Sequence, residues 1–190
     1  MSSSVTVSAP GKILLAGGYL VLERPNVGLV LAADKRFFTT VRPLHGVIQG
    51  TILVKSPQFH AQWEYHYNAD GLCASPANAS TNDFVEKTLR VVLLLLQPPP
   101  DTLALEIIIQ ADNDFYSVLP HLHDSKSPQA VRQLDRFLKC PTDAHGKAIV
   151  HKTGLGSSAA LTTSLVGAWL QQHRLYSNCS LSLSFYQMLP

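Results

Sequence analysis

One segment in the C-terminal part of the chain combines the residue types of a phosphate-binding loop. Its residues are Lys152, Thr153, Gly154, Leu155, Gly156, Ser157, Ser158, Ala159 and Ala160. Glycines let a backbone approach an anion closely, and a helix start offers unpaired N–H groups at the positive end of the helix dipole. The hydroxyl groups of Ser157 and Ser158 can bind phosphate oxygens or a magnesium ion. This combination predicts a cradle for phosphate groups.

Other interpretations of this loop can be tested on the residues. From the spacing alone, an ordinary helix that is capped after a glycine turn remains an alternative interpretation. A Walker A loop ends in Gly-Lys-Ser/Thr, and no lysine follows Gly156. A dinucleotide fingerprint matches at Gly154, Gly156 and Ala159, but that motif needs an acidic residue about 20 residues further on. No Asp or Glu follows Asp143, so the residues disfavour this motif.

The elements that would position the loop are predicted from the spacing of apolar residues. Runs rich in β-branched or alternating apolar residues predict strands at 5–9, 12–16, 36–42, 51–55 and 63–67. Pro10-Gly11 and Gly17-Gly18 are expected to end the first two of these strands. The N-terminal third is therefore predicted to be rich in β-structure with tight connections.

The rest of the chain is predicted to alternate helices with strands. An apolar stripe at helical spacing predicts a helix from about residue 81 to 97, which Pro98-Pro99-Pro100 would end. Aliphatic residues at 103–109 predict a buried strand. The other predicted elements are a short helix over 128–139 with Ser127 as its N-cap, a strand over 148–151 and a helix over 159–173. This order indicates an α+β fold with a mixed or antiparallel sheet.

A second motif lies near the N-terminus and becomes informative when it is considered together with the loop. Alone, Pro10-Gly11-Lys12 is only a turn with a solvated lysine. Ala9-Pro10-Gly11-Lys12 and the downstream Gly-Leu-Gly-Ser-Ser-Ala loop, in this order, resemble the first two motifs of the GHMP kinases. The resemblance covers roughly Val5 to Leu175. It implies the N-terminal domain of the GHMP kinase fold (ribosomal protein S5 domain 2-like), with helices on one face of the sheet.

Several segments are similar to the phosphomevalonate kinases within that family. These segments are Ala16–Leu22, Phe84–Leu89, Asn113–Ser117 and the Lys152-Thr153 pair before the loop. The resemblance implies that ATP gives its terminal phosphoryl group to 5-phosphomevalonate and yields 5-diphosphomevalonate, a step of the mevalonate pathway of isoprenoid biosynthesis. Mevalonate kinase and homoserine kinase chemistry are the alternatives within the family.

The resemblance also implies roles for single residues. Lys12 would place a positive charge beside the transferring phosphoryl group. Lys152 and Gly154 to Ala159 would bind ATP, and Ser158 would contact Mg²⁺, which is the expected cofactor. The residues expected near the acceptor are Gly17, Gly18, Tyr19, Asn113 and Ser117.

The C-terminal end of the chain departs from the family. The expected division is an ATP-binding domain at 1–175 and a divergent tail at 176–190, without the family's C-terminal domain. The absent part would supply an acidic residue and close the acceptor pocket, so little or no kinase activity is expected of these 190 residues alone. An apolar face left open would invite a partner or self-association. A non-catalytic fragment that binds nucleotide or a partner chain is the alternative function from a different class.

Composition argues against several other functions. A formal net charge of +2 without a long basic run does not predict nucleic-acid binding. No apolar run is long enough for a membrane span, and the N-terminus lacks a signal-peptide pattern. Three scattered cysteines indicate a reducing compartment, for which the cytoplasm is expected and the peroxisome is the alternative by family analogy. His121 and His123 could share a strand face, but without a third ligand nearby a metal site is disfavoured.

Overall fold

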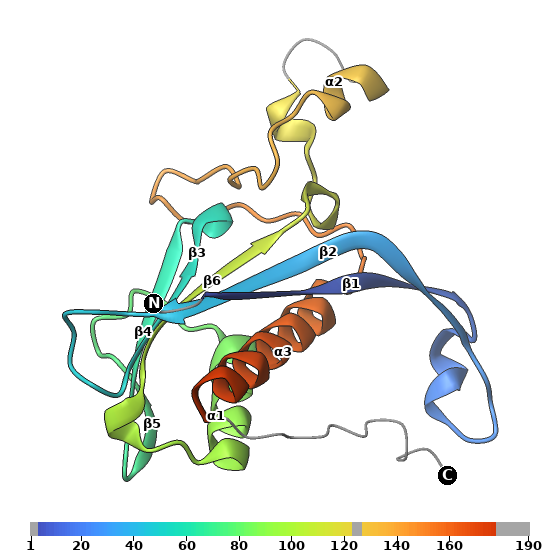
Figure 1. The fold of residues 1–190 in the computed structure, drawn as a ribbon. Coiled ribbons are helices and arrows are strands. Elements are labelled where there is room, and N and C mark those ends of the chain that lie inside the picture. The colour runs from blue at the N-terminus through green and yellow to red at the C-terminus, as the bar shows by residue number, and fades with distance from the viewer. Residues whose placement is uncertain (1–3, 123–126, 178–190) are drawn as a thin grey trace.

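A mixed six-stranded sheet forms the centre of the molecule (Figure 1). The computed structural model describes residues 4–122 and 127–177 of the chain. The strands are β1 (Val5–Ala16), β2 (Leu29–Pro43), β3 (Thr51–Ser56), β4 (Ala61–Asn68), β5 (Gly71–Ala74) and β6 (Ala104–Ala111), in the spatial order β1-β2-β6-β3-β4-β5. Strands β3 and β6 are parallel and all other neighbours are antiparallel, which confirms the predicted mixed sheet. The expectations for His123 and for the tail from residue 178 onwards lie outside the described residues.

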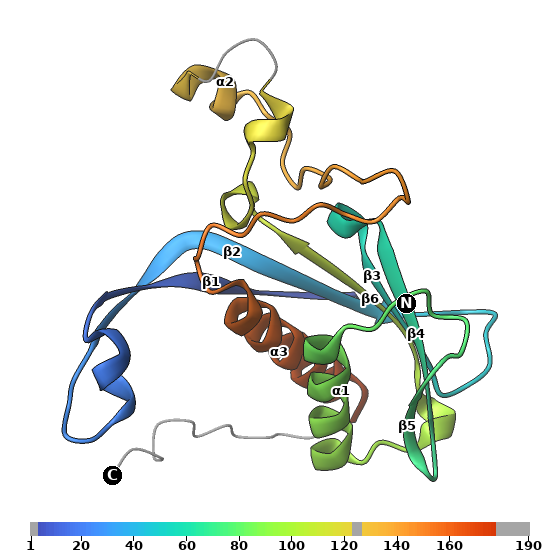
Figure 2. The same ribbon diagram turned by 180° about the vertical axis from the view of Figure 1, so that it is seen from behind.

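Two helices, α1 (Asp83–Leu96) and α3 (Ser157–Ser177), cover one face of this sheet, as Figure 2 shows from behind. Val41 of β2 and Ile107 of β6 point into the layer between sheet and helices, where they join Leu89 of α1 and Leu165 of α3 in one buried cluster. The side chain of Asn82 caps α1 by accepting a hydrogen bond from the N–H group three residues further on. The predicted helix over 81–97 and the predicted placement of helices on one face are confirmed. None of the helices in residues 4–122 and 127–177 has the length and apolarity needed to cross a membrane.

The opposite face of the sheet carries polar side chains around one buried acid. Glu106 lies between Leu105 and Ile107 of β6, which both point toward the helices, so its own side chain points away from them. Glu106 is buried, and it accepts hydrogen bonds from Arg42 on β2 and, over 2.7 Å, from Lys55 on β3. Burial alone would raise the pKa of Glu106, but the hydrogen bonds and charges of Lys55 and Arg42 outweigh it and hold the pKa below its usual value.

Replacing Glu106 by glutamine is expected to lower the free energy of unfolding at neutral pH by about 1–3 kcal/mol, because Arg42 and Lys55 then lose a charged acceptor. The lowered pKa means that this stabilisation is present above the ordinary glutamate pKa and is lost as the pH falls through the lower folded-state value. Urea unfolding followed by circular dichroism should therefore show a steeper loss of stability in acid for the original chain than for Glu106→Gln. Glu64→Gln, which removes a half-exposed partner of His66, serves as the control and should change stability by less than about 1 kcal/mol. Equal acid dependence of the original chain and Glu106→Gln would contradict the prediction.

The first strand differs from its prediction. Pro10-Gly11 does not end it, and β1 continues to Ala16 with a shift in its pairing with β2 between Pro10 and Lys12. Because β1 lies at the edge of the sheet, the proline needs no ladder partner on its open side. At the irregularity, one residue of β1 lies opposite three residues of β2. The two predicted strands at 5–9 and 12–16 are therefore one strand.

The region after β6 is less regular than predicted. Helix α2 (Pro128–Arg132) is capped by Ser127 as predicted, but it ends seven residues before the predicted end at 139. The predicted strand over 148–151 is absent from the described structure, and Ala148 makes only an isolated bridge with Thr142. Strand β5 was not predicted from the sequence. The remaining elements are the 3-10 helices η1 (Gly18–Leu22), η2 (Pro57–Phe59), η3 (Pro100–Thr102), η4 (Asn113–Phe115) and η5 (Leu119–His121).

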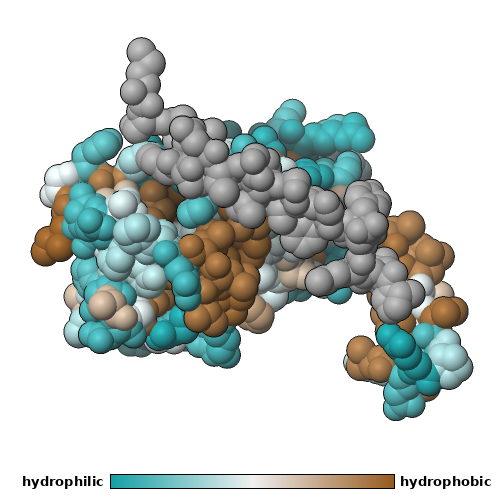
Figure 3. Space-filling model, turned by 60° about the horizontal axis from the view of Figure 1, so that its bottom comes forward, coloured by the Kyte–Doolittle hydropathy of each residue, from teal (hydrophilic) through white to brown (hydrophobic). Residues whose placement is uncertain are grey.

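Beyond Lys12, the ends of β1 and β2 and the connection between them form a protruding hairpin, here called the arm (residues 13–31; Figure 1). Successive strand residues point to opposite faces, yet Ile13, Leu14 and Leu15 are all 42–55% exposed, so neither face of the arm is covered. The other exposed large hydrophobic residues of the arm are Tyr19, Leu20, Leu22, Val27, Leu29, Val30 and Leu31. Figure 3 shows the arm as the projection at the right, where hydrophobic residues in brown lie beside hydrophilic ones in teal. Exposed apolar residues gathered in one segment are typical of an interaction site.

Candidate functional site

The predicted phosphate loop lies at the start of α3. Gly154 and Gly156 have φ values of 93° and 71°, in the left-handed region that glycine adopts without strain. The chain turns here so that α3 begins at Ser157, two residues earlier than predicted. The first bond of the helix is made by the Ala160 N–H group, which donates to the Gly156 carbonyl at 3.2 Å.

The start of α3 leaves polar groups available to a ligand. The N–H groups of Ser157, Ser158 and Ala159 precede the first helical hydrogen bond, so they have no acceptor within the helix. Within the described part of the chain, neither the Ser157 nor the Ser158 hydroxyl makes a hydrogen bond. The first turn of α3 also contains no acidic residue that would repel an anion. These groups fit a phosphate group, which needs several hydrogen-bond donors and favours the positive end of a helix.

Lys12 lies directly against this loop. Its N–H group donates to the Leu155 carbonyl at 2.9 Å. Its side chain runs past Gly156, where an added Cβ atom would lie 2.9 Å from Cγ and 3.3 Å from Cε of Lys12. The Lys12 side chain is exposed, so its ammonium group can reach a ligand at the loop. The two motifs, far apart in the sequence, thus meet in space.

Gly11 makes this approach possible. A Cβ atom at this position would lie 2.9 Å from the Leu155 carbonyl oxygen and 3.0 Å from Cζ of Phe115. Gly11 was predicted only to break a strand together with Pro10, although its place directly before Lys12 was the available signal. Phe115, buried beside the Phe37 ring at 4.7 Å between centroids, forms the floor beneath this contact.

Replacing Gly11 by alanine is expected to destabilise the fold by about 1–3 kcal/mol and to weaken binding of AMPPNP, because the loop backbone must move away. Gly167→Ala is a matched control, since its Cβ would also meet an atom at 2.9 Å, but that atom is a side-chain methyl of Val7. Thermal unfolding and titration calorimetry with AMPPNP should separate the two variants. A Gly11→Ala chain that binds the nucleotide as tightly as the original would show that the contact with Leu155 does not shape the loop.

The Asn113–Ser117 segment lies beside the residues that lead into the loop. The Ser117 N–H group donates to the His151 carbonyl at 2.8 Å, and Tyr116 forms an isolated bridge with Lys152. The Thr153 hydroxyl donates to the Asp114 carbonyl at 2.6 Å. The segment identified in the sequence is therefore adjacent to the loop, and Thr153, which sequence reasoning gave no role, ties the two together.

The Asn113 side chain is already engaged in the protein. Its amide nitrogen donates to the Asp135 carbonyl at 2.8 Å, and its amide oxygen accepts from the Leu138 N–H group at 2.9 Å. These bonds hold residues 135–138 in the irregular connection after α2, within the range that was predicted to be helical. Asn113 thus has a structural role, and its role in binding an acceptor stays a prediction.

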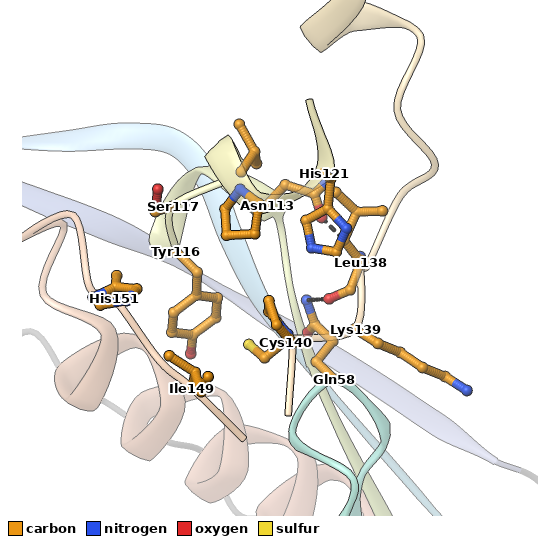
Figure 4. Close-up of a pocket in the computed structure, with 13 residues that line it drawn as sticks. Gln58, Asn113, Tyr116, Ser117, His121, Leu138, Lys139, Cys140, Ile149 and His151 are labelled. Carbon is orange, nitrogen blue, oxygen red and sulfur yellow. Dashed lines mark hydrogen bonds between the residues drawn. The ribbon is translucent and has the colours of Figure 1, made fainter. Parts of the chain in front are cut away.

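Two pockets border the Asn113–Ser117 segment. Figure 4 shows the first, around Tyr116 and Cys140, whose space of about 20 Å³ is enough for about one water molecule. Burial raises the pKa of both Cys140 and Tyr116, so both groups stay protonated at neutral pH. The second is an open pocket of about 520 Å³. Its lining includes Lys35, Asn113, Asp114, Ser117, Arg132 and Thr153.

Gly17, Gly18 and Tyr19 are not brought to the loop by any described contact. They lie where β1 passes into η1 on the arm, and Tyr19 is 92% exposed. A Cβ atom on Gly17, whose φ is 112°, would lie 2.8 Å from the Gly28 backbone, so this glycine permits the two sides of the arm to approach. Within the described residues, no hydrogen bond or ion pair joins residues 17–19 to Lys12 or to the loop. Their role toward an acceptor stays a prediction.

The chain is similar in sequence to phosphomevalonate kinases. It is 33% identical over 196 residues to the peroxisomal phosphomevalonate kinase of Arabidopsis thaliana and 36% identical over 185 residues to a phosphomevalonate kinase of Gibberella zeae. Both alignments cover 88% of this chain and 39% of the relative, so the chain spans about two fifths of the length of these curated relatives. No protein-family model matches the chain.

A solved structure shows the same fold. The chain matches Streptococcus pneumoniae phosphomevalonate kinase in complex with phosphomevalonate and AMPPNP with a TM-score of 0.50 and 14% identity, over 90% of this chain and 37% of that one. At this identity the likeness concerns the fold alone. The predicted α+β fold of the GHMP kinases and the predicted resemblance to phosphomevalonate kinases are both confirmed.

Proposed function

We propose that residues 1–175 form the ATP-binding domain of a kinase that phosphorylates 5-phosphomevalonate to 5-diphosphomevalonate in the mevalonate pathway of isoprenoid biosynthesis. The observation that carries this proposal is the contact between Lys12 and Gly156, which joins a basic side chain to a helix start with free donors. The similarity to phosphomevalonate kinases from a plant and a fungus supports the choice of acceptor.

The start of α3 is the proposed site for the ATP phosphates. The N–H groups of residues 157–159 and the Ser157 and Ser158 hydroxyls would donate to phosphate oxygens, with Leu155 and Gly156 shaping the turn. Lys152, which is exposed just before the loop, is a weaker candidate contact. Mg²⁺ is the proposed cofactor; bound at the phosphates it would neutralise charge, and the Ser158 hydroxyl would supply one oxygen ligand.

The open pocket beside Ser117 is the proposed place for the acceptor. Its lining includes the cations Lys35 and Arg132, of which Lys35 is paired with the Asp114 carboxylate at 3.8 Å. Thr153 connects the pocket to the loop. Because 5-phosphomevalonate already carries an anionic phosphate, positive charge serves it better than a general base does. An oxygen of that phosphate would form a bond to the terminal phosphorus of ATP as the bond to ADP breaks, and Lys12 would stabilise the charge between them.

The arm supports a further part of the proposal. Its uncovered hydrophobic residues offer a surface for a partner chain, a second copy or the part of the relatives' length that this chain does not span. The part of the relatives' length that this chain does not span would complete the acceptor site, and positioning contributes up to about 7–11 kcal/mol to catalysis. The 190 residues alone are therefore expected to bind nucleotide weakly and to transfer phosphoryl groups near the background rate. The same surface favours, as the second candidate function, a non-catalytic fragment that binds nucleotide and a partner chain.

The proposed compartment is the cytoplasm, with the peroxisome as the alternative because the Arabidopsis relative carries that name. Reduced cysteines fit both compartments. Microscopy of the chain fused to a fluorescent protein at its N-terminus would distinguish a diffuse signal from a punctate one.

Two measurements test the proposed function. Titration of the chain with AMPPNP and Mg²⁺ should give saturable binding. Absence of saturable binding would mean that Lys12 and the loop do not form a nucleotide site. A protein that continues this chain to the length of its relatives should then be offered mevalonate and 5-phosphomevalonate side by side. Preference for 5-phosphomevalonate is expected, whereas preference for the unphosphorylated alcohol would refute the proposed acceptor and leave another GHMP kinase activity.

A further inference from the structure

Helix α3 lines a further pocket, near the end of the helix that lies opposite to the loop. This pocket of about 290 Å³ lies between α3, the η3 turn and the start of β6. Its lining residues are Pro98, Pro99, Thr102, Leu103, Leu105, Trp169, Gln172 and His173. Gln172 follows Ser158 by 14 residues, which places it roughly 20 Å further along the helix axis. The pocket is therefore separate from the proposed ATP and acceptor sites.

The residues described in the lining of this pocket are mostly apolar. Pro98 and Pro99 are among them, and Leu103, Leu105 and Trp169, each at most 8% exposed, belong to the buried core of the molecule. Pockets that take small molecules have this character, with few polar groups that orient the ligand, and begin at about 300 Å³. Rings of proline and tryptophan favour a flat apolar or aromatic body.

The one amide in the lining is buried without a partner. Gln172 is 2% exposed, and neither its Nε2 nor its Oε1 atom has a hydrogen-bond partner. Buried side-chain amides almost always have partners, because leaving donor and acceptor unpaired destabilises the fold. The Tyr65 hydroxyl is the other buried unpaired group found in the described part of the chain, and Tyr65 does not line this pocket. An amide kept in this costly state beside a pocket points to a ligand that pairs with it.

We propose that this pocket binds a small molecule with a flat apolar body and a neutral amide or lactam group, which pairs with the Gln172 amide. A primary amide presents an N–H donor and a C=O acceptor side by side, and another amide edge complements both at once. Among the described lining residues, His173 is the only one with a titratable side chain, so these residues offer little charge for a strongly anionic ligand. A turn of the Gln172 side chain toward the pocket brings its amide to the ligand.

Benzamide is the probe for this proposal, and N,N-dimethylbenzamide, which has no N–H donor, is its matched comparison. In nitrogen–proton correlation spectra of the 190-residue chain, benzamide should shift the Gln172 side-chain amide and the Trp169 indole N–H signals. Benzamide should bind at least about fivefold more tightly than the dimethyl compound, because it alone can donate to Oε1. Absence of these shifts at saturating benzamide, or equal affinity for the two compounds, would overturn the proposal.

Gln172→Met separates binding from structure. It removes the unpaired amide, keeps an unbranched side chain, and should leave the melting temperature of the ligand-free chain equal or higher. It should also weaken benzamide binding about tenfold, whereas Gln171→Met, at the exposed neighbouring position of α3, should leave both properties unchanged. A lower melting temperature or loss of folding in Gln172→Met would mean that the amide has a structural partner, and the proposal would fall. Gln172 amide protons that are protected from solvent exchange and insensitive to benzamide would mean that a protein segment fills the pocket, which also overturns it.

Discussion

Replacing Lys12 by methionine is expected to lower the rate of phosphoryl transfer to 5-phosphomevalonate by about 10²–10³-fold. Strand β1 holds the lysine backbone against Leu155, and the exposed side chain passes over Gly156 at the start of α3. In the proposed site its charge would lie where negative charge spreads during transfer. Methionine retains the unbranched stem that contacts Gly156, so the loop should keep its shape and AMPPNP affinity should change much less than kcat.

The assay for Lys12→Met requires a protein in which this chain continues to the length of its relatives. Lys152→Met is the matched control, because Lys152 is exposed beside the same loop but no described side-chain contact places it over the helix start. The control should retain kcat within a few fold. If Lys152→Met lost as much activity as Lys12→Met, or if Lys12→Met raised the KM for ATP at an unchanged kcat, the catalytic role of Lys12 would be wrong.

Replacing Gly156 by alanine is expected to weaken AMPPNP binding by more than about tenfold. Alanine in the left-handed conformation costs about 1–2 kcal/mol, which corresponds to a factor of about 5–30. At Gly156, whose φ is 71°, the new Cβ would also lie 2.9 Å from Cγ of Lys12 and push the side chain aside. The loss therefore combines backbone strain in the loop with displacement of the lysine.

Gly154→Ala separates these two causes. Its φ of 93° imposes similar strain, but nothing lies within 4 Å of the added Cβ. Titration calorimetry should give a smaller loss for Gly154→Ala than for Gly156→Ala. The double variants with Lys12→Ala, which removes the Cγ atom that the new Cβ of residue 156 would meet, should remove the difference. Equal losses in the two single variants would show that the Lys12 side chain does not depend on the space that Gly156 leaves.

The sequence predicted most of the regular fold because its signals are local. Strands β2, β3, β4 and β6 and helix α1 carry apolar residues at the matching period, and Asn82 and the prolines after Leu96 mark the ends of α1. The continuous strand β1 was not predicted, since the effect of Pro10-Gly11 depends on its position at the sheet edge. Such a position is a property of the assembled sheet and leaves no local pattern in the chain.

The candidate site was predicted in outline, and its supporting contacts were not. The phosphate loop and Lys12 were identified from motifs, and their meeting was implied only by resemblance to a family. The need for Gly11 follows from the distance to the Leu155 carbonyl, and the structural role of Asn113 follows from bonds to residues more than 20 positions away. Contacts between distant backbone segments of this kind have no periodicity from which to predict them.

The position of β6 has a consequence for how the chain folds. In the sheet it lies between β2 and β3, although it follows β3, β4 and β5 in the chain. Until Ala111 has emerged from the ribosome, the β1–β2 hairpin and the β3–β4–β5 meander have no shared border, and a two-stranded hairpin alone is marginally stable. The nascent chain therefore carries two open strand edges over a long stretch of translation, which is the condition under which chains fold slowly and engage chaperones.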